Sequence, residues 1–243
     1  MKPLGRKNYG SIGHLPCSRM GPADHACHPG QQRICLEKVR DKHDQIIVTE
    51  KLDGSNVGVA RVGDNIFALG RAGYLAQTSK YEQHQLFAYW VREREDFWRD
   101  VLKPGQRLVG EWMAQAHGTR YLLPKGPFAA FDLMEGERRL PFDTLRSVCD
   151  GFQIPMPRLL HVGGPLAIDR AMSLHGLGDH GAEEPEGVVY RVERNGKYDF
   201  MAKWVRPDKA DGKYLPEVTG SISSVPVWNW RPSPAPKDGG ADV

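Results

Sequence analysis

The sequence has few of the features that mark secreted or membrane proteins. It holds only four cysteines in 243 residues, and no secretory signal accompanies them, so a disulfide framework is not expected. No run of about 18 apolar residues is present, which argues against a transmembrane helix. The opening MKPLGRKNYGSIGHLP is basic but lacks the apolar centre of a signal peptide. We therefore expect a cytoplasmic protein with no membrane partner.

The chain also lacks a strong charge and any internal repeat. Its net charge is +3 and its pI about 8.6, a mild excess that permits a nucleic-acid partner without indicating one. No self-similarity is present at periods of 20 to 50 residues. With 40% hydrophobic residues, the chain is long enough for one large core or two small ones.

Composition and periodicity divide the chain into three parts. Residues 1–45 are rich in Gly, Pro, His and Cys without a helical or strand period, and are predicted to be an irregular arm packed on the core. Residues 46–220 carry the regular patterns and form the predicted domain. Residues 221–243 are rich in Pro, Gly and Ser and are predicted to be a flexible tail.

Within the domain, strands dominate and helices intervene. Strands are predicted at 46–54, 56–62, 66–73, 107–113 and 126–134, and as two runs on either side of Asn195-Gly196, a dipeptide typical of hairpin turns. Helical spacing of apolar residues predicts helices over 80–102 and 141–151. The predicted fold class is α+β, with antiparallel sheets and flanking helices.

The stretch TEKLDGSNVGV, residues 49–59, raises the question of chemistry. Lys51 stands at the end of a predicted strand, and the Asp53-Gly54 turn follows. A lysine is a nucleophile only when unprotonated, so its site must lower its pKa. Taken alone, the stretch is better explained as a strand, a turn and an exposed lysine.

Other polar and aromatic residues stand at strand ends or within apolar strands: Arg71, Glu111, Phe128, Phe131, Glu186 and Lys203. An arginine after a hairpin could bind phosphate or ribose oxygens, although a solvated surface arginine is individually the simpler reading. A lone carboxylate on an apolar strand is costly without a partner. Either phenylalanine could stack on a base, although each alone fits a core residue.

The order Lys, Arg, Glu, Phe, Glu, Lys resembles the covalent nucleotidyltransferase superfamily of ATP-dependent ligases and mRNA capping enzymes. Lys51-x-Asp53-Gly54 is similar to its nucleotidyl-lysine motif. Later motifs follow in order at Arg71, Glu111, Phe128-x-x-Phe131-Asp132, Glu186-Gly187-Val188-Val189 and Lys203. The resemblance covers about two thirds of the chain. Asn56, five residues after Lys51, matches an asparagine of the RNA ligase 2-like branch that engages the RNA end.

This resemblance implies an ATP-grasp-like adenylyltransferase domain over 46–220, and an ATP-dependent RNA ligase that self-adenylates on Lys51. It implies catalytic roles for Lys51, Asn56 and Lys203. The implied nucleotide-binding residues are Glu50, Lys51, Asp53, Gly54, Arg71, Glu111, Phe128, Glu186 and Lys203. Phe128 would stack on adenine, with Phe131 as the alternative, and Glu186 would bind Mg²⁺ or Mn²⁺. The implied partner is RNA with a 5′-phosphate and a 3′-hydroxyl, in a nicked duplex.

Two departures from the pattern keep alternatives open. The last motif usually carries two lysines one residue apart, and here the first position is Met201. Only 37 residues follow Arg206, which suggests a minimal ligase or one that relies on a protein partner to grip nucleic acid. A DNA ligase, another nucleotidyltransferase of the superfamily, or a non-catalytic module that binds nucleic-acid ends are the alternatives.

The arm contains a second set of potential ligands: His14, Cys17, His25, Cys27, His28 and Cys35. Zinc sites use four such side chains, often with two cysteines separated by two to four residues. The cysteines here do not keep that spacing. Loop and surface residues are therefore favoured over a zinc site.

Overall fold

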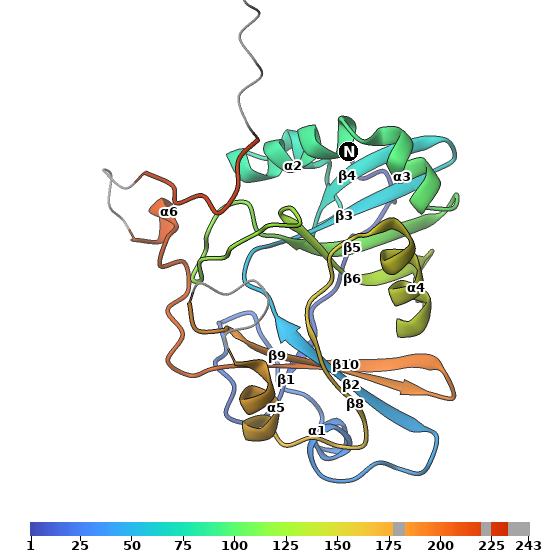
Figure 1. Ribbon diagram of the computed structural model, residues 1–243, viewed down its shortest axis with the longest axis vertical. Helices are drawn as coiled ribbons and strands as arrows, with labels where there is room; N and C mark the ends of the chain where they lie inside the picture. The colour runs from blue at the N-terminus through green and yellow to red at the C-terminus, as the bar shows by residue number, and fades with distance from the viewer. Residues whose placement is uncertain (177–182, 220–224, 233–243) are drawn as a thin grey trace, which may run out of the picture.

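Two five-stranded sheets frame the protein in the computed structural model, which describes residues 1–176, 183–219 and 225–232 (Figure 1). In the described residues, the first sheet has the order β1-β10-β9-β2-β8 and the second the order β4-β3-β5-β6-β7. The first sheet contains β1 (Gly13–His14), β2 (Asp44–Lys51), β8 (Leu159–Gly163), β9 (Gly187–Arg194) and β10 (Lys197–Val205). The second contains β3 (Ser55–Val62), β4 (Asn65–Gly70), β5 (Gln106–Trp112), β6 (Phe128–Glu135) and β7 (Arg138–Arg139).

Adjacent strands are antiparallel except β1 and β10, which pair in parallel. The hairpin between β9 and β10 turns at Asn195 and Gly196, both with positive φ (51° and 67°), as an Asn-Gly turn requires. The chain passes from the first sheet to the second directly after β2, and returns to the first at β8. This crossing brings the end of β2 to the space between the sheets.

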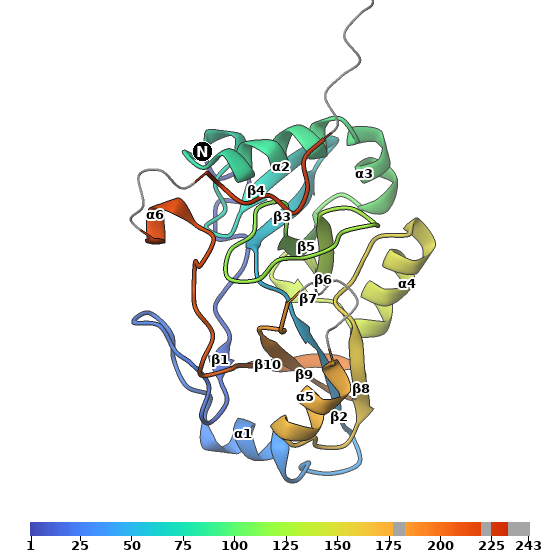
Figure 2. The same cartoon turned by 60° about the vertical axis from the view of Figure 1, so that its left-hand side comes forward.

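Helices cover both sheets, as Figures 1 and 2 show. The second sheet is packed against α2 (Glu82–Arg92) and α3 (Glu95–Val101), with α4 (Phe142–Phe152) against β6. The first sheet is packed against α1 (Pro29–Leu36) and α5 (Ile168–His175). The short η1 (Ala76–Thr78) precedes α2, and α6 (Pro216–Thr219) follows β10. None of the helices in the described part of the chain combines the length and apolar character needed to cross a membrane.

Each sheet has its own core. Beneath the second sheet, the fully buried aromatic side chains of Phe87, Trp98, Trp112 and Phe128 pack together. Beneath the first, the alternating inward residues of β2 and β9 pack against α1 and α5. The prediction of an α+β fold with antiparallel sheets is confirmed, because alternating apolar residues bury one face of each sheet under helices.

Several elements differ from the sequence-based predictions, and β7, β8 and α5 were not predicted. The helix expected over 80–102 is two helices, because the chain leaves helical geometry at Arg94 (φ −128°, ψ 29°). The bend allows Trp98 to pack edge-on against Trp90, with ring centroids 5.6 Å apart. The arm is not irregular throughout, since it contains β1 and α1. That helix was missed because it is short and its capping box uses His28 and Gln31, whereas Ser, Thr, Asp and Asn are the usual N-caps.

Part of the predicted flexible tail is also ordered. Trp228 and Trp230 pack against the core of the second sheet, and the Asn229 N–H donates to the Ala114 carbonyl at 2.8 Å. The tryptophans bury apolar surface that a Pro- and Ser-rich composition does not suggest. Residues 221–224 and 233–243 of that tail lie outside the described residues.

Candidate active site

A cavity of about 620 Å³ lies between the two sheets. Its walls come from strands of both sheets, from residues 9–12 of the arm, and from the segment after β10. Of the predicted site residues, only Phe128 does not line this cavity. The nine that line it are Glu50, Lys51, Asp53, Gly54, Asn56, Arg71, Glu111, Glu186 and Lys203. Residues scattered over more than 150 positions of sequence are therefore brought to one site by the two-sheet arrangement.

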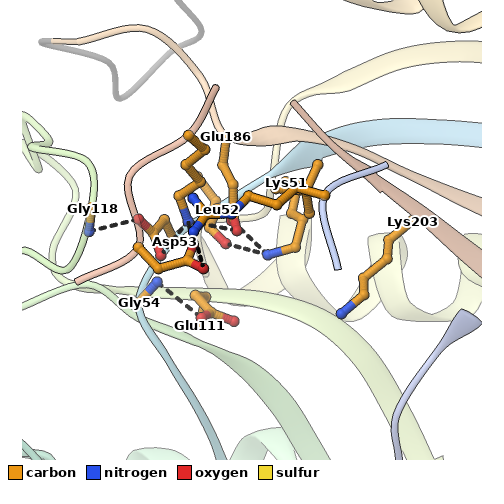
Figure 3. A network of polar contacts seen from close by, with 12 residues as sticks. Lys51, Leu52, Asp53, Gly54, Glu111, Gly118, Glu186 and Lys203 are labelled. Carbon is orange, nitrogen blue, oxygen red and sulfur yellow. Dashed lines mark hydrogen bonds and ion pairs between the residues drawn. The ribbon is translucent and has the colours of Figure 1, made fainter. Parts of the chain in front are cut away.

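The turn after Lys51 is held rigidly by three hydrogen bonds. The Asp53 N–H donates to the Tyr121 hydroxyl at 2.8 Å, and the Gly118 N–H donates to the Asp53 carboxylate at 2.8 Å. The Gly54 N–H donates to Glu111 at 3.0 Å (Figure 3). A Cβ on Gly54 would lie 2.5 Å from the Trp112 carbonyl oxygen, so only glycine allows this approach.

Lys51 is held by the carboxylate of Glu186, which directly precedes β9, the strand paired with β2 in the same sheet. Its Nζ lies 2.5 Å from Glu186 Oε2, and Figure 3 shows the two side chains directed toward each other. Burial by itself would lower the pKa of Lys51, but the negative charges of Glu186, Glu111 and Asp53 outweigh it and hold that pKa above its usual value. In this state Lys51 is protonated.

Lys203 approaches the same cavity from β10 and is held by the arm. Its Nζ lies 3.2 Å from Asp24 Oδ1, and His14 Nε2 lies 3.2 Å from the other oxygen of Asp24. Burial and the nearby charge of Lys51 lower the pKa of Lys203. The pKa of Asp24 falls to about 2, because the Gly21 N–H and Lys203 outweigh the effect of burial. The arm thus positions Lys203, one of the cations predicted for the site.

Glu111 is an acid in an unfavourable environment. Burial raises its pKa to about 7; Lys51 opposes this rise, whereas Glu186 and Asp53 add to it. A carboxyl group with such a pKa changes charge near neutral pH. Its hydrogen bond from Gly54 ties that charge to the turn behind Lys51.

Phe128 was predicted to stack on adenine, and the structure contradicts that prediction. Its side chain is 2% exposed and packs in the aromatic core against Phe87 and Trp98. Phe131, the alternative, lines the cavity and packs edge-on against Tyr9, with centroids 5.3 Å apart. Residues three apart on a strand face opposite sides of the sheet, so only one of the two can face the cavity.

Three other predicted site residues line the cavity, but their side chains lie in different environments. Glu50 lines the cavity, but its carboxylate accepts the Arg158 N–H at 2.8 Å and lies 3.9 Å from His175. Arg71 lines the cavity from an exposed turn. Asn56 Oδ1 is buried without a hydrogen-bond partner among the described residues, which is rare for a polar atom in a folded protein.

Sequence reasoning missed Lys209, in the segment after β10. Its side chain is 3% exposed, and its Nζ lies 2.7 Å from Glu186 and 3.0 Å from Asp53. A lysine in a polar loop carries no periodic signal that would reveal it. The sequence also did not reveal the cation beside Met201. Arg139 Nη1 lies 3.1 Å from the Met201 sulfur, so a guanidinium group lies next to the position of the expected lysine.

The donor set around Lys209 fits a divalent cation in part. Two carboxylates, from Glu186 and Asp53, converge on one ammonium group, and carboxylate oxygens are the ligands that Mg²⁺ and Mn²⁺ prefer. In the described residues, no group of three or more His, Cys, Asp or Glu side chains could hold a metal ion. Magnesium usually keeps several waters and is held by one or two carboxylates, with substrate phosphates added when a nucleotide is bound, so these residues suit a hydrated cation with or without a nucleotide.

The cysteines of the arm do not gather into a zinc site in the described structure. Cys27 and Cys35 are buried in the core of the first sheet, and Cys17 is exposed. Burial raises the pKa of the Cys27 thiol to about 11. The buried cysteines act as small apolar side chains.

Two antiparallel sheets around a cavity, with a lysine at the strand end before an Asp-Gly turn and acids facing it, define a nucleotidyltransferase fold. Residues 44–205 match the family model described as RNA ligase, and the chain therefore belongs to the RNA ligase family.

Solved structures share the fold. An archaeal ATP-dependent RNA ligase is 21% identical with a TM-score of 0.51, over 81% of this chain and 48% of that one. A Naegleria gruberi RNA ligase mutant with ATP and Mn is 18% identical with a TM-score of 0.54, over 82% of this chain and 60% of that one. The N. gruberi RNA ligase with PPi is 17% identical with a TM-score of 0.53, over 86% and 62%. The chain thus spans about half to three fifths of the length of these structures. No curated protein matches it.

Proposed function

We propose that the protein is an ATP-dependent RNA ligase whose nucleophile is Lys51. The observation that carries the proposal is the position of Lys51. It lines a cavity of nucleotide size, forms an ion pair with Glu186 and comes just before a rigid Asp-Gly turn. Membership of the RNA ligase family and similarity to RNA ligase structures with ATP and Mn or with PPi support it.

In the first step, unprotonated Lys51 Nζ would attack the α-phosphorus of ATP. A P–N bond forms, the P–O bond to pyrophosphate breaks, and the lysine proton passes to solvent or a neighbouring carboxylate. Lys203 and Arg71 would bind phosphate or ribose oxygens and stabilise the developing charge. Phe131 would stack on adenine. Glu186 with Asp53 would hold Mg²⁺ or Mn²⁺, which neutralises phosphate charge when bound.

In the later steps, AMP would pass from Lys51 to the 5′-phosphate of an RNA strand, and a 3′-hydroxyl would then displace it. Asn56 would act here, since its buried Oδ1 has no hydrogen-bond partner among the residues that the structure describes. A nicked duplex is the proposed substrate because it holds both RNA ends in register. A protein partner would strengthen binding of the RNA. The four free cysteines support a reducing compartment, and we propose the cytoplasm.

The test is a search for the covalent intermediate. Purified protein incubated with ATP and Mg²⁺ is expected to gain the mass of one AMP residue, located on Lys51 by peptide mass spectrometry. Lys51→Ala should remain unmodified, whereas Lys213→Met, a change at a half-exposed lysine, should be modified like the wild type. An adduct that persists in Lys51→Ala would disprove the assignment of the nucleophile.

Three alternatives are separated by the same preparation. Labelling with GTP instead of ATP would indicate a guanylyltransferase, and sealing of nicked DNA but not nicked RNA would indicate a DNA ligase. A protein that binds nicked RNA but never forms the adduct would be a non-catalytic end-binding module. That alternative is favoured by Met201 at the position of the expected lysine.

A further inference from the structure

Lys209 is a buried cation, 4% exposed, that lines the candidate active site, and the sequence motifs assign it no role. It follows β10 and lies beyond residues 44–205, the part that matches the family model. Its Nζ lies 2.7 Å from Glu186 Oε1, 3.0 Å from Asp53 Oδ1 and 3.7 Å from Asp211 Oδ1. A buried ammonium needs such carboxylate partners because it has left bulk water.

The ammonium of Lys209 and a divalent cation compete for the same oxygens. Glu186 already gives its other oxygen to Lys51, at 2.5 Å, so both oxygens of this carboxylate are engaged by lysines. Asp53 gives its second oxygen to the Gly118 N–H. A cation bound at 2.0–2.1 Å from these oxygens would lie within a few ångströms of the Lys209 ammonium, and the like charges would repel each other.

We propose that Lys209 is a resident cation of the active site, which neutralises Glu186 and Asp53 until a divalent cation displaces it. The proposal rests on the proposed ligase function for its biological meaning but not for its test. Asp211 offers a position to which Lys209 can move, because its carboxylate is 61% exposed and already lies 3.7 Å away. Lys209 thereby positions the two carboxylates in the free protein and keeps them from repelling each other.

The first experiment measures Mn²⁺ binding to the nucleotide-free protein by electron paramagnetic resonance. Lys209→Met is expected to bind Mn²⁺ about tenfold more tightly than the wild type, because a competing charge is removed. Lys209→Arg keeps the charge and should bind within about twofold of the wild type. The matched control Lys213→Met, in the same segment but paired with Glu183, should also remain unchanged. Equal or weaker Mn²⁺ binding by Lys209→Met, or no measurable binding by any variant, would overturn the proposal.

The second experiment uses the wild-type chain and does not depend on whether a variant folds. Lysine acetylation followed by peptide mass spectrometry reports the accessibility of each amine. Lys209 should react slowly without metal and several-fold faster with saturating Mn²⁺, while Lys213 reacts equally in both. Unchanged protection of Lys209 in saturating Mn²⁺ would show that metal does not displace it.

The two proposals can fail separately. An AMP adduct on Lys51 combined with unchanged Mn²⁺ affinity in Lys209→Met would overturn the role of Lys209 alone. If Lys209→Met binds Mn²⁺ more tightly but the wild-type protein never forms the adduct, the ligase function alone would be overturned.

Discussion

Lys51 Nζ and Glu186 Oε2 form an ion pair of 2.5 Å that joins the end of β2 to the residue before β9. The two residues are 135 positions apart in sequence, and the antiparallel pairing of β2 with β9 places Lys51 opposite Gly187. The lysine proposed as nucleophile is therefore held in its unreactive, protonated form by the carboxylate proposed to bind metal. Activation requires Glu186 to exchange that lysine for another cation.

Lys203→Ala should reduce the rate of adduct formation by roughly 10²–10³-fold, the usual effect of removing one donor that stabilises developing negative charge. The rate is measured with labelled ATP in single-turnover experiments. Asp24→Asn, which leaves the lysine in place but removes its partner, should have a smaller effect. A variant lacking Lys203 that reacts at the wild-type rate would exclude it from the first step.

Asn56→Ala should form the AMP adduct nearly as fast as the wild type but fail to seal nicked RNA. The reason is that Asn56 Oδ1 has no hydrogen-bond partner in the described part of the chain, whereas a substrate contact would be lost. The two steps are measured separately, by adduct formation and by gel assay of sealing. Loss of the adduct itself in this variant would contradict the later role proposed for Asn56.

Phe131→Ala and Phe128→Ala should separate binding from stability. Loss of a stacking side chain costs about 1–3 kcal/mol of base binding, so Phe131→Ala should weaken ATP binding by about 10- to 100-fold. Truncating the core residue Phe128, which is 2% exposed, should instead cost about 3–5 kcal/mol of unfolding free energy. ATP titration and urea denaturation measure the two effects. Weaker ATP binding in folded Phe128→Ala than in Phe131→Ala would reverse the assignment.

Glu111→Gln should stabilise the nucleotide-free protein above neutral pH. The pKa of Glu111 is raised to about 7 in the folded protein, so the folded chain keeps a proton that the unfolded chain releases near pH 4.5. Stability is therefore lost as pH rises from about 4.5 through 7, by about 1–3 kcal/mol. Thermal unfolding should show a higher Tm for Glu111→Gln than for the wild type at pH 8, and a smaller difference at pH 5. A difference independent of pH would contradict the shifted pKa.

Local chemistry was enough to predict seven of the ten described strands (β1, β7 and β8 were not predicted), the Asn195-Gly196 hairpin and the turn after Lys51. These features depend on residues adjacent in sequence, such as the Asn195-Gly196 dipeptide, whose residues both adopt positive φ. The order of the charged residues, read with the family resemblance, also predicted nine of the residues that line the cavity. The identity of Lys51 as the candidate nucleophile thus came from the sequence.

Other features depend on contacts between distant segments, which leave no pattern in the sequence. Which of Phe128 and Phe131 faces the cavity is decided by which side of β6 is covered by α2 and α3. Lys203 pairs with Asp24, 179 residues away in sequence, and Lys209 pairs with Glu186, 23 residues away. Alternation along a strand fixes which residues share a face, but only the packing of the two sheets determines which face is core and which surrounds the ligand.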